Sequence, residues 1–288
     1  MSTTRVPDRV QHAVRAASRT VGRWTADRRM LPTFLISGAQ RCGTTSMYKT
    51  LTAHQQVLPA VLHKGVHYFD TNFGRGLDWY RGHFPTNAAA RRAEAAAGGP
   101  VITGESSPYY MFHPMAGRRI AATLPDARMI ILLRDPVERA YSAFTHESAR
   151  GFEDQPFERA LALEEARLAG EEERLIADPT YVSFHHQHHA YVGRGRYADQ
   201  LERLEREVGR ERLLVIDSGD LFTDPRPIFE RICAFLDLSP WQPARFDRHN
   251  ARPRSGMDEQ LRRSLAKGFE VDDERLGAWL GGTPSWRR

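Results

Sequence analysis

The stretch that decides the fold is Phe34-Leu-Ile-Ser-Gly38-Ala-Gln-Arg41-Cys-Gly43-Thr44-Thr45-Ser46. It begins like a buried strand, passes through a turn that contains glycine, and continues as a helical pattern. Such a turn exposes backbone N–H groups at the helix N-terminus, where the helix dipole also favours an anion. The sequence therefore predicts a phosphate-binding loop at 38–46.

This loop differs at one position from the nucleoside-triphosphate loop GxxxxGK[ST]. Thr44 stands where that motif has the lysine that reaches the β- and γ-phosphates. The cation of the loop is instead Arg41, two residues before Gly43. The missing lysine disfavours an ATPase, a GTPase or a P-loop kinase.

A second junction between a strand and a helix contains residues that suit a second phosphate-binding site. The apolar run 129–133 suits a buried parallel strand, and Arg134 follows it directly. Pro136 suits the first turn of a helix, and Ser142 then lies about two turns along it. An arginine and a hydroxyl suit a terminal phosphate, because charge-assisted hydrogen bonds to phosphate are short and strong. The alternative for Arg134 is a salt bridge with a neighbouring carboxylate such as Glu138.

Short apolar segments alternate with helical patterns from residue 32 onward, which is typical of an α/β domain. We therefore expect a P-loop-like three-layer fold with a central parallel sheet flanked by helices. Residues 1–31 form a basic N-terminal arm with a helical pattern, and 32–288 form one folded domain. The stretch 88–99 is expected to be a helix fragment plus loop, and it is a candidate insertion. Strands are predicted at 33–37, 101–103, 128–133 and 213–217, and helices near 44–53, 114–124, 136–149, 156–175, 185–208 and 225–237.

The net charge of +5, from 41 lysines and arginines against 36 acidic residues, belongs to the arm. Residues 1–30 carry seven arginines and two aspartates, and the other 258 residues carry 34 charges of each sign. A balanced body argues against a nucleic-acid binder, which normally presents a basic face.

Localisation and partners follow from the arm, the apolar runs and the cysteines. In the arm, apolar residues recur between arginines, so it either packs on the domain or contacts an anionic membrane surface peripherally. The longest apolar run has five residues, whereas a span needs about 20, so we expect no membrane span. Two cysteines and no apolar secretory signal indicate the cytoplasm. The oligomeric state stays open.

The motif Arg41-x-Gly43-Thr44-Thr45 after a strand resembles the phosphosulfate loop of sulfotransferases that use 3′-phosphoadenosine 5′-phosphosulfate (PAPS), where Lys-x-Gly-Thr is the common form. In that family an arginine at a later strand end and a serine eight residues on bind the 3′-phosphate, as Arg134 and Ser142 are spaced here. Over roughly 32–256 the chain is similar to the heparan sulfate, or carbohydrate, branch. The similar blocks are 64–70, 76–85, 104–110, 213–217, 220–221, 224–225 and 235–238.

The resemblance implies transfer of a sulfuryl group from PAPS, with adenosine 3′,5′-bisphosphate as the product. The acceptor is expected to be a hydroxyl or amine of a carbohydrate-containing or small metabolite. Arg41 would stabilise the leaving oxygen, and the loop would hold the 5′-phosphate. The implied cofactor-binding residues are Arg41, Cys42, Gly43, Thr44, Thr45, Ser46, Arg134 and Ser142, with Arg252 and Arg254 on the loop that closes over the cofactor in the family or, alternatively, on an ordinary basic loop.

The general base departs from the family pattern. The heparan sulfate enzymes commonly read Lys-Glu-Val-His where this chain has Lys64-Gly65-Val66-His67, so the usual glutamate is absent. His67 is our preferred base, because imidazole titrates near neutrality, and Asp70 would orient it or help bind substrate. The alternative is that His67 only lines the acceptor pocket and that Glu105 or Asp70 is the base.

The acceptor side is expected to contain one cation fewer than in relatives, because Ser106 stands where they often have lysine. This disfavours a highly sulfated glycan acceptor. The run His185-His186-Gln-His188-His189 lacks a carboxylate or cysteine to complete a metal site, so we expect no metal. The predicted substrate-binding residues are Lys64, Glu105, Tyr109, His189 and Tyr197.

Two other classes of function stay open at this point. One is a P-loop kinase or nucleotide phosphotransferase, which would need ATP and Mg²⁺. The other is a non-catalytic nucleotide-binding protein, which the departure at Gly65 leaves possible.

Overall fold

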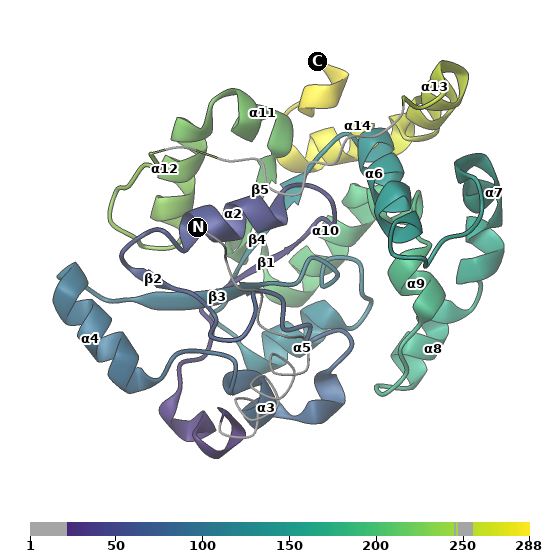
Figure 1. Ribbon diagram of the computed structural model, residues 1–288. Helices are drawn as coiled ribbons and strands as arrows, with labels where there is room; N and C mark the ends of the chain where they lie inside the picture. Colours follow the sequence, from purple (N-terminus) through teal and green to yellow (C-terminus); the bar gives the residue numbers. More distant parts are fainter. Residues whose placement is uncertain (1–21, 245, 247–255) are drawn as a thin grey trace, which may run out of the picture.

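The computed structural model describes residues 22–244, 246 and 256–288. Its centre is a sheet of five parallel strands in the order β2-β3-β1-β4-β5, with helices on both faces (Figure 1). The predicted three-layer α/β fold is therefore confirmed. The strands are β1 (Phe34–Gly38), β2 (Val57–Leu58), β3 (Ile102–Ser106), β4 (Arg128–Leu133) and β5 (Leu213–Asp217).

The sheet order reverses around β1. Phe34 pairs with Gly104 of β3 on one side and with Arg128 of β4 on the other. Right-handed crossovers place α2 (Thr44–Leu51) on one face, and α5 (Ala116–Thr123) and α10 (Tyr197–Val208), which pack together, on the other. Ligands of open α/β sheets bind at the carboxyl ends of the strands beside such a reversal. The loop that follows β1 therefore lies where this architecture binds ligands.

Strands β1 and β4 form the middle of the hydrophobic core. All five residues of β1 are buried, as are residues 129–133 of β4. A strand covered on both faces is apolar along its length, which explains why these two strands were readable from the sequence. At Gly104 a Cβ atom would lie 2.5 Å from the ring and the carbonyl oxygen of Phe34, so β1 and β3 can approach only with glycine there.

Most predicted elements are present with small shifts at their ends. The four predicted strands correspond to β1, β3, β4 and β5. The stretch expected to be a helix fragment plus loop is nearly all helix, because Thr86 caps its start and Gly98, with φ of +68°, ends it. The confirmed helices are α2, α5, α6 (Pro136–Ser148) and α12 (Pro225–Phe235), and the stretch near residue 88 is α4 (Asn87–Ala97).

Two long predicted helices are wrong because each one is broken. The first consists of α7 (Phe157–Leu168) and α8 (Glu171–Ala177), separated at Gly170, whose φ is +73°. The second consists of α9 (Phe184–His188), the 3₁₀ turn η3 (Gly193–Gly195) and α10.

The break between α9 and α10 has a cause in the tertiary structure. The Glu164 carboxylate accepts hydrogen bonds from the backbone N–H groups of Tyr191, Val192 and Gly193, at 2.9, 2.8 and 2.8 Å. These amides therefore bond to a carboxylate rather than to helix carbonyls. Gly195 in the same turn approaches the Phe269 ring so closely that a Cβ atom would lie 2.8 Å from it.

Several short or peripheral elements were not predicted. The two helices after residue 258 belong to the folded body, because α13 (Glu259–Gly268) contacts α6 and α14 (Glu270–Leu280) packs against α10. The unpredicted elements are β2, α3 (Leu77–Arg81), α11 (Ser218–Thr223), α13 (Glu259–Gly268), α14 (Glu270–Leu280), η1 (Ala26–Arg28), η2 (Phe73–Arg75), η4 (Arg210–Arg212) and η5 (Ser285–Arg287).

The basic arm falls largely outside the described residues, which begin at residue 22. Its last residues pack on the domain: the Arg29 guanidinium donates to the Phe84 carbonyl at 2.7 Å, and the Met30 N–H donates to the Pro85 carbonyl at 2.9 Å. Within the described residues, no helix is both long enough and apolar enough to cross a bilayer.

The contact between β1 and β3 can be tested with Gly104→Ala. The added methyl group has no space beside Phe34, so the free energy of unfolding should fall by about 1–3 kcal/mol in urea titrations. Gly268→Ala is the matched control, because nothing lies within 4 Å of a Cβ atom at that helical position. It should leave stability unchanged or raise it by up to about 1 kcal/mol. Equal effects of the two substitutions would contradict the close packing.

Candidate active site

The predicted phosphate-binding loop lies at the carboxyl end of β1 and leads directly into α2. The Ala39 N–H donates to the Leu132 carbonyl at 2.7 Å, which fixes the loop to β4. Arg41 and Gly43 both have positive φ, +71° and +94°, and Gly43 is the N-cap of α2. The first N–H groups of a helix have no partner within it, so the first turn of α2 offers donors to an anion.

The loop contributes both buried and accessible groups. The side chains of Thr44 and Ser46 are buried beneath it, whereas Arg41, Gly43 and Thr45 are partly exposed. Accessible groups of this kind can contact a ligand.

The structure brings the two predicted phosphate sites together. Arg41 Nε donates to Ser142 Oγ at 3.1 Å, although the residues are 101 positions apart. Arg134 directly follows β4, the strand beside β1. Its guanidinium donates to Glu138 Oε2 at 3.2 Å, and Glu138 also pairs with Arg262 at 2.5 Å. The salt bridge that the sequence offered as the alternative role of Arg134 is therefore present. It holds the partly exposed guanidinium against Glu138 of α6.

The backbone of both loops is fixed by buried side chains. The Tyr197 hydroxyl donates to the Arg134 carbonyl at 2.8 Å, and Ser218 Oγ donates to the Cys42 carbonyl at 2.8 Å. Burial raises the pKa of the Cys42 thiol to about 11. Cys42 is therefore a neutral, packed residue at neutral pH. No local pattern pointed to Ser218, because it is 176 positions from its partner.

His67 and Asp70 form a hydrogen-bonded pair. Nδ1 of His67 lies 2.8 Å from Oδ2 of Asp70, with the histidine side chain 36% exposed and that of the aspartate buried. Burial disfavours the imidazolium, but the charge and the hydrogen bond of Asp70 outweigh burial and raise the pKa of His67. Burial likewise disfavours the carboxylate, and His67 outweighs it and lowers the pKa of Asp70. Because Nδ1 bonds to the carboxylate, Nε2 is the nitrogen left to act on a substrate.

Gly65 is the position at which relatives commonly have glutamate. A Cβ atom here would lie 2.9 Å from the backbone oxygen of Ser106 and 3.5 Å from Nε2 of His67. The space into which a side chain at 65 would extend therefore borders the imidazole of His67. A larger residue at 65 would require the backbone of 65 or 106 to shift.

Glu105 is fully buried at the centre of a hydrogen-bond network. Its oxygens accept from the hydroxyls of Tyr80, Tyr110 and Ser107 at 2.7, 2.8 and 2.6 Å, and from the Val66 N–H at 2.9 Å. Burial raises the pKa of this carboxyl despite these donors. With both oxygens occupied inside the protein, Glu105 shapes the segment that contains His67 and is a poor candidate for the base.

The predicted acceptor-side residues divide by exposure. Lys64 is only half-buried, and burial, together with Lys49, lowers its pKa to about 8. The other four are buried and bonded internally: Glu105 as above, Tyr197 to Arg134, Tyr109 through its hydroxyl to His186 Nδ1 at 2.7 Å, and His189 through Nε2 to the Phe152 carbonyl at 2.8 Å. Residue type and chain position could not predict this burial.

The remaining predictions concern metals and two arginines. Within the described residues, no cluster of three or more histidine, cysteine or acidic side chains could hold a metal ion. His185 and His189 instead face each other, with 2.8 Å between their Nδ1 atoms. Arg252 and Arg254 lie outside the described residues.

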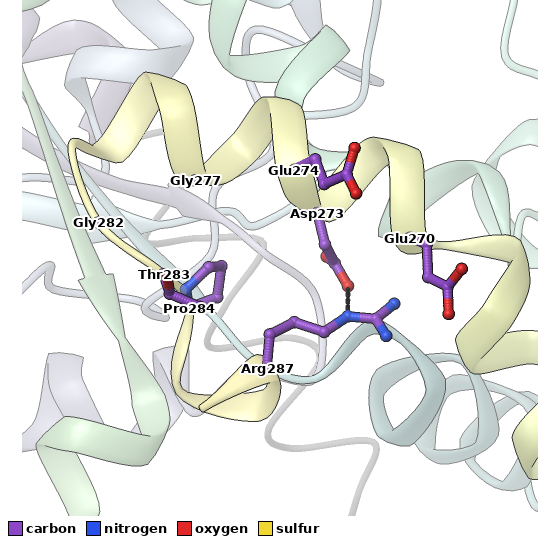
Figure 2. Close-up of a pocket in the computed structure, with 8 residues that line it drawn as sticks. All are labelled: Glu270, Asp273, Glu274, Gly277, Gly282, Thr283, Pro284 and Arg287. Carbon is purple, nitrogen blue, oxygen red and sulfur yellow. Dashed lines mark hydrogen bonds and ion pairs between the residues drawn. The ribbon is translucent and has the colours of Figure 1, made fainter.

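A pocket of about 470 Å³ lies elsewhere, between α14 and the C-terminal turn (Figure 2). Figure 2 shows Arg287 reaching across it to the buried Asp273, at 2.6 Å. None of the predicted site residues lines this pocket, so we do not assign it to the site. Its lining is Glu270, Asp273, Glu274, Gly277, Gly282, Thr283, Pro284 and Arg287.

A family model of the sulfotransferase domain matches residues 31–253. The chain belongs to the sulfotransferase family. Membership in this family shows that the protein is a transferase. The alternative function, a P-loop kinase or nucleotide phosphotransferase, is not favoured.

Named relatives and a solved structure agree with this assignment. The bifunctional heparan sulfate N-deacetylase/N-sulfotransferase 1 of Caenorhabditis elegans is 24% identical over 279 residues, 88% of this chain and 30% of the relative. The corresponding protein 3 of Homo sapiens is 30% identical over 225 residues, 75% of this chain and 23% of the relative. The sulfotransferase thus spans less than a third of either relative's length. A crystal structure of a sulfotransferase from Alicyclobacillus acidocaldarius matches with a TM-score of 0.66 and 30% identity, covering 90% of this chain and all of that one.

The pair formed by His67 and Asp70 predicts how stability depends on pH. A raised histidine pKa stabilises the fold below the unfolded value of about 6.5, and this contribution is lost as the pH rises through the raised value. The lowered pKa of Asp70 stabilises the fold above about 3.9. His67→Gln should therefore cost more unfolding free energy at about pH 5.5 than at about pH 9 in urea titrations. Equal costs at the two pH values would contradict the charged pair.

Proposed function

We propose that the protein transfers a sulfuryl group from PAPS to a hydroxyl or amine of a carbohydrate-containing or small metabolite acceptor. The observation that carries this proposal is the contact between Arg41 and Ser142, which joins the loop after β1 to the helix after β4. The loop after β1 and the start of the helix after β4 lie beside each other, and two neighbouring anion sites there would suit one ligand with two phosphate groups. PAPS has that form, with a phosphate on the 3′ position and a phosphosulfate on the 5′ position.

In the proposed complex each loop holds one end of the nucleotide. The N–H groups of 43–46 and the hydroxyl of the partly exposed Thr45 would bind the 5′-phosphate, and Arg134 and Ser142 would bind the 3′-phosphate. The guanidinium of Arg134 already bonds to Glu138, so it would share or exchange that partner on binding. Arg252 and Arg254 are proposed as further contacts.

The proposed reaction is an in-line displacement at sulfur. The acceptor oxygen or nitrogen forms a bond to sulfur while the bond between sulfur and the bridging phosphate oxygen breaks. The electron pair leaves with adenosine 3′,5′-bisphosphate, and Arg41 would stabilise the charge that develops there. The acceptor proton would pass to Nε2 of His67, while Asp70 holds Nδ1.

The acceptor is proposed to lie beside His67 and Lys64, the two half-buried groups on this side. The names of two relatives specify N-sulfotransferases of heparan sulfate, which makes an amino sugar a reasonable first acceptor to test. The other predicted acceptor-side residues are buried, so they would affect the acceptor only indirectly, through the groups to which they hydrogen-bond. They are Glu105, Tyr109, His189 and Tyr197.

The cellular setting remains part of the proposal. Both cysteines are free and buried, in agreement with a reducing compartment, and we propose the cytoplasm. Peripheral membrane contact through the basic arm is proposed on its sequence alone.

Titration calorimetry with adenosine 3′,5′-bisphosphate tests the nucleotide assignment. Arg134→Ala should weaken binding by about 10- to 100-fold, because it removes charge-assisted bonds to a phosphate. Arg128→Ala is the matched control, since Arg128 lies at the opposite end of the same strand and pairs with Asp237. The nucleotide assignment fails if the wild type does not bind, or if the two variants bind equally well.

The pH dependence of turnover tests the base. His67 accepts a proton only when neutral, so with an amino-sugar oligosaccharide as the acceptor kcat should rise with pH through the raised pKa of His67. His67→Ala should lose about 100-fold or more in kcat, together with this rise, while its circular dichroism spectrum stays that of the wild type. Undiminished turnover in His67→Ala would remove it from this role. Nucleotide binding without transfer to any acceptor would favour a non-catalytic protein.

A further inference from the structure

Arg194 is a buried arginine that bonds to the phosphate-binding loop 38–46. Its side chain donates from Nη1 to Oε1 of Gln40 at 2.6 Å. From Nη2 it donates to the carbonyls of His186 and Gln187, at 3.1 and 2.8 Å. Only 4% of the residue is exposed. Gln40 directly precedes Arg41, so Arg194 contacts the loop at its cationic end.

The charge of Arg194 has no carboxylate partner among the described residues. Burial lowers its pKa to about 10, so it is still protonated at neutral pH. Burying a charge without an ion pair is costly, and only part of this cost is offset by two carbonyl groups and by the rings of Tyr109 and Phe112, at 4.7 and 5.1 Å. The carboxylates of Glu147 and Asp70 attract this charge only from beyond ion-pair distance, so no salt bridge from the described part of the chain neutralises it next to the loop.

We propose that Arg194, acting through Gln40, is a positioning residue for the 5′-phosphate end of the nucleotide. Its bond to Gln40 holds the turn in which Arg41 takes positive φ. Its positive charge, in surroundings of low polarity, favours a dianion on the other side of the loop. This inference rests on the proposed function, since it assumes that the loop holds that phosphate.

The segment around Arg194 is rigid enough for such a role. The Gln200 amide donates to the carbonyls of Arg194 and Arg196, at 3.2 and 2.9 Å. Tyr197, which begins α10 three residues later, donates to the carbonyl of Arg134 at the other proposed phosphate site. Arg194 and Tyr197 therefore contact different phosphate sites, and the effect of Arg194 should be confined to the 5′ end.

Two nucleotides distinguish positioning from general damage. Adenosine 3′,5′-bisphosphate has both phosphates, whereas adenosine 3′-monophosphate lacks the 5′ one. In calorimetric titrations, Arg194→Met should weaken binding of the bisphosphate by about tenfold and leave binding of the monophosphate within about twofold. Arg194→Lys, which keeps the charge, should recover part of the loss. A merely structural role would weaken both nucleotides in parallel.

A second variant keeps the test valid if Arg194→Met does not fold. Gln40→Leu removes the acceptor of the bond but leaves Arg194 in place, and it should show the same selective loss. In the double variant the losses should not add, because the two residues act through one contact. Arg128→Met, at the far end of β4, controls for a lost arginine, and it should leave both affinities unchanged.

The outcomes separate the inference from the proposed function. If the wild type prefers the bisphosphate, but Gln40→Leu and Arg194→Met leave that preference unchanged, the inference alone is overturned. If the wild type binds neither nucleotide, the proposed function fails and the inference fails with it. Selective, non-additive loss of the bisphosphate supports both.

Discussion

The pairing of β1 with β4 is the constraint on which the site depends. Residues 34–38 pair with 128–131, and the register shifts between Ile36 and Gly38, just before the loop. The Ala39 N–H then bonds to the Leu132 carbonyl. Because both strands run parallel and are buried on both faces, the loops that follow them emerge at the same edge. Arg41 can therefore reach Ser142, which brings the two predicted anion sites next to each other.

A layer of buried side chains fixes this edge from behind. Arg194 bonds to the loop after β1, Tyr197 bonds to the carbonyl of Arg134, and Ser218 bonds to the carbonyl of Cys42. On the acceptor side, Glu105 accepts the Val66 N–H and the Ser107 hydroxyl, and Ser107 Oγ in turn accepts the His67 N–H at 3.0 Å. Among the groups proposed to touch ligands, Ser142 is buried, and the side chains of Arg41, Lys64, His67 and Arg134 are partly exposed.

The sequence predicted what depends on local pattern. Strands β1 and β4 were readable because continuous burial makes them continuously apolar, and the helix starts after them were readable from Gly43 and Pro136. It could not predict what depends on distant contacts. The helix predicted at 185–208 is broken by Glu164, which takes the amides of 191–193. The burial of Tyr109, His189 and Tyr197 follows from tertiary packing that residue type does not encode.

The central claim is that the two neighbouring strand ends bind the two phosphates of one nucleotide. A crystal structure with adenosine 3′,5′-bisphosphate bound tests it most directly. We predict that the 5′-phosphate binds to the N–H groups of 43–46 and the 3′-phosphate to Arg134 and Ser142. Density for the nucleotide in the pocket beside Asp273 and Arg287, with both loops unoccupied, would contradict it.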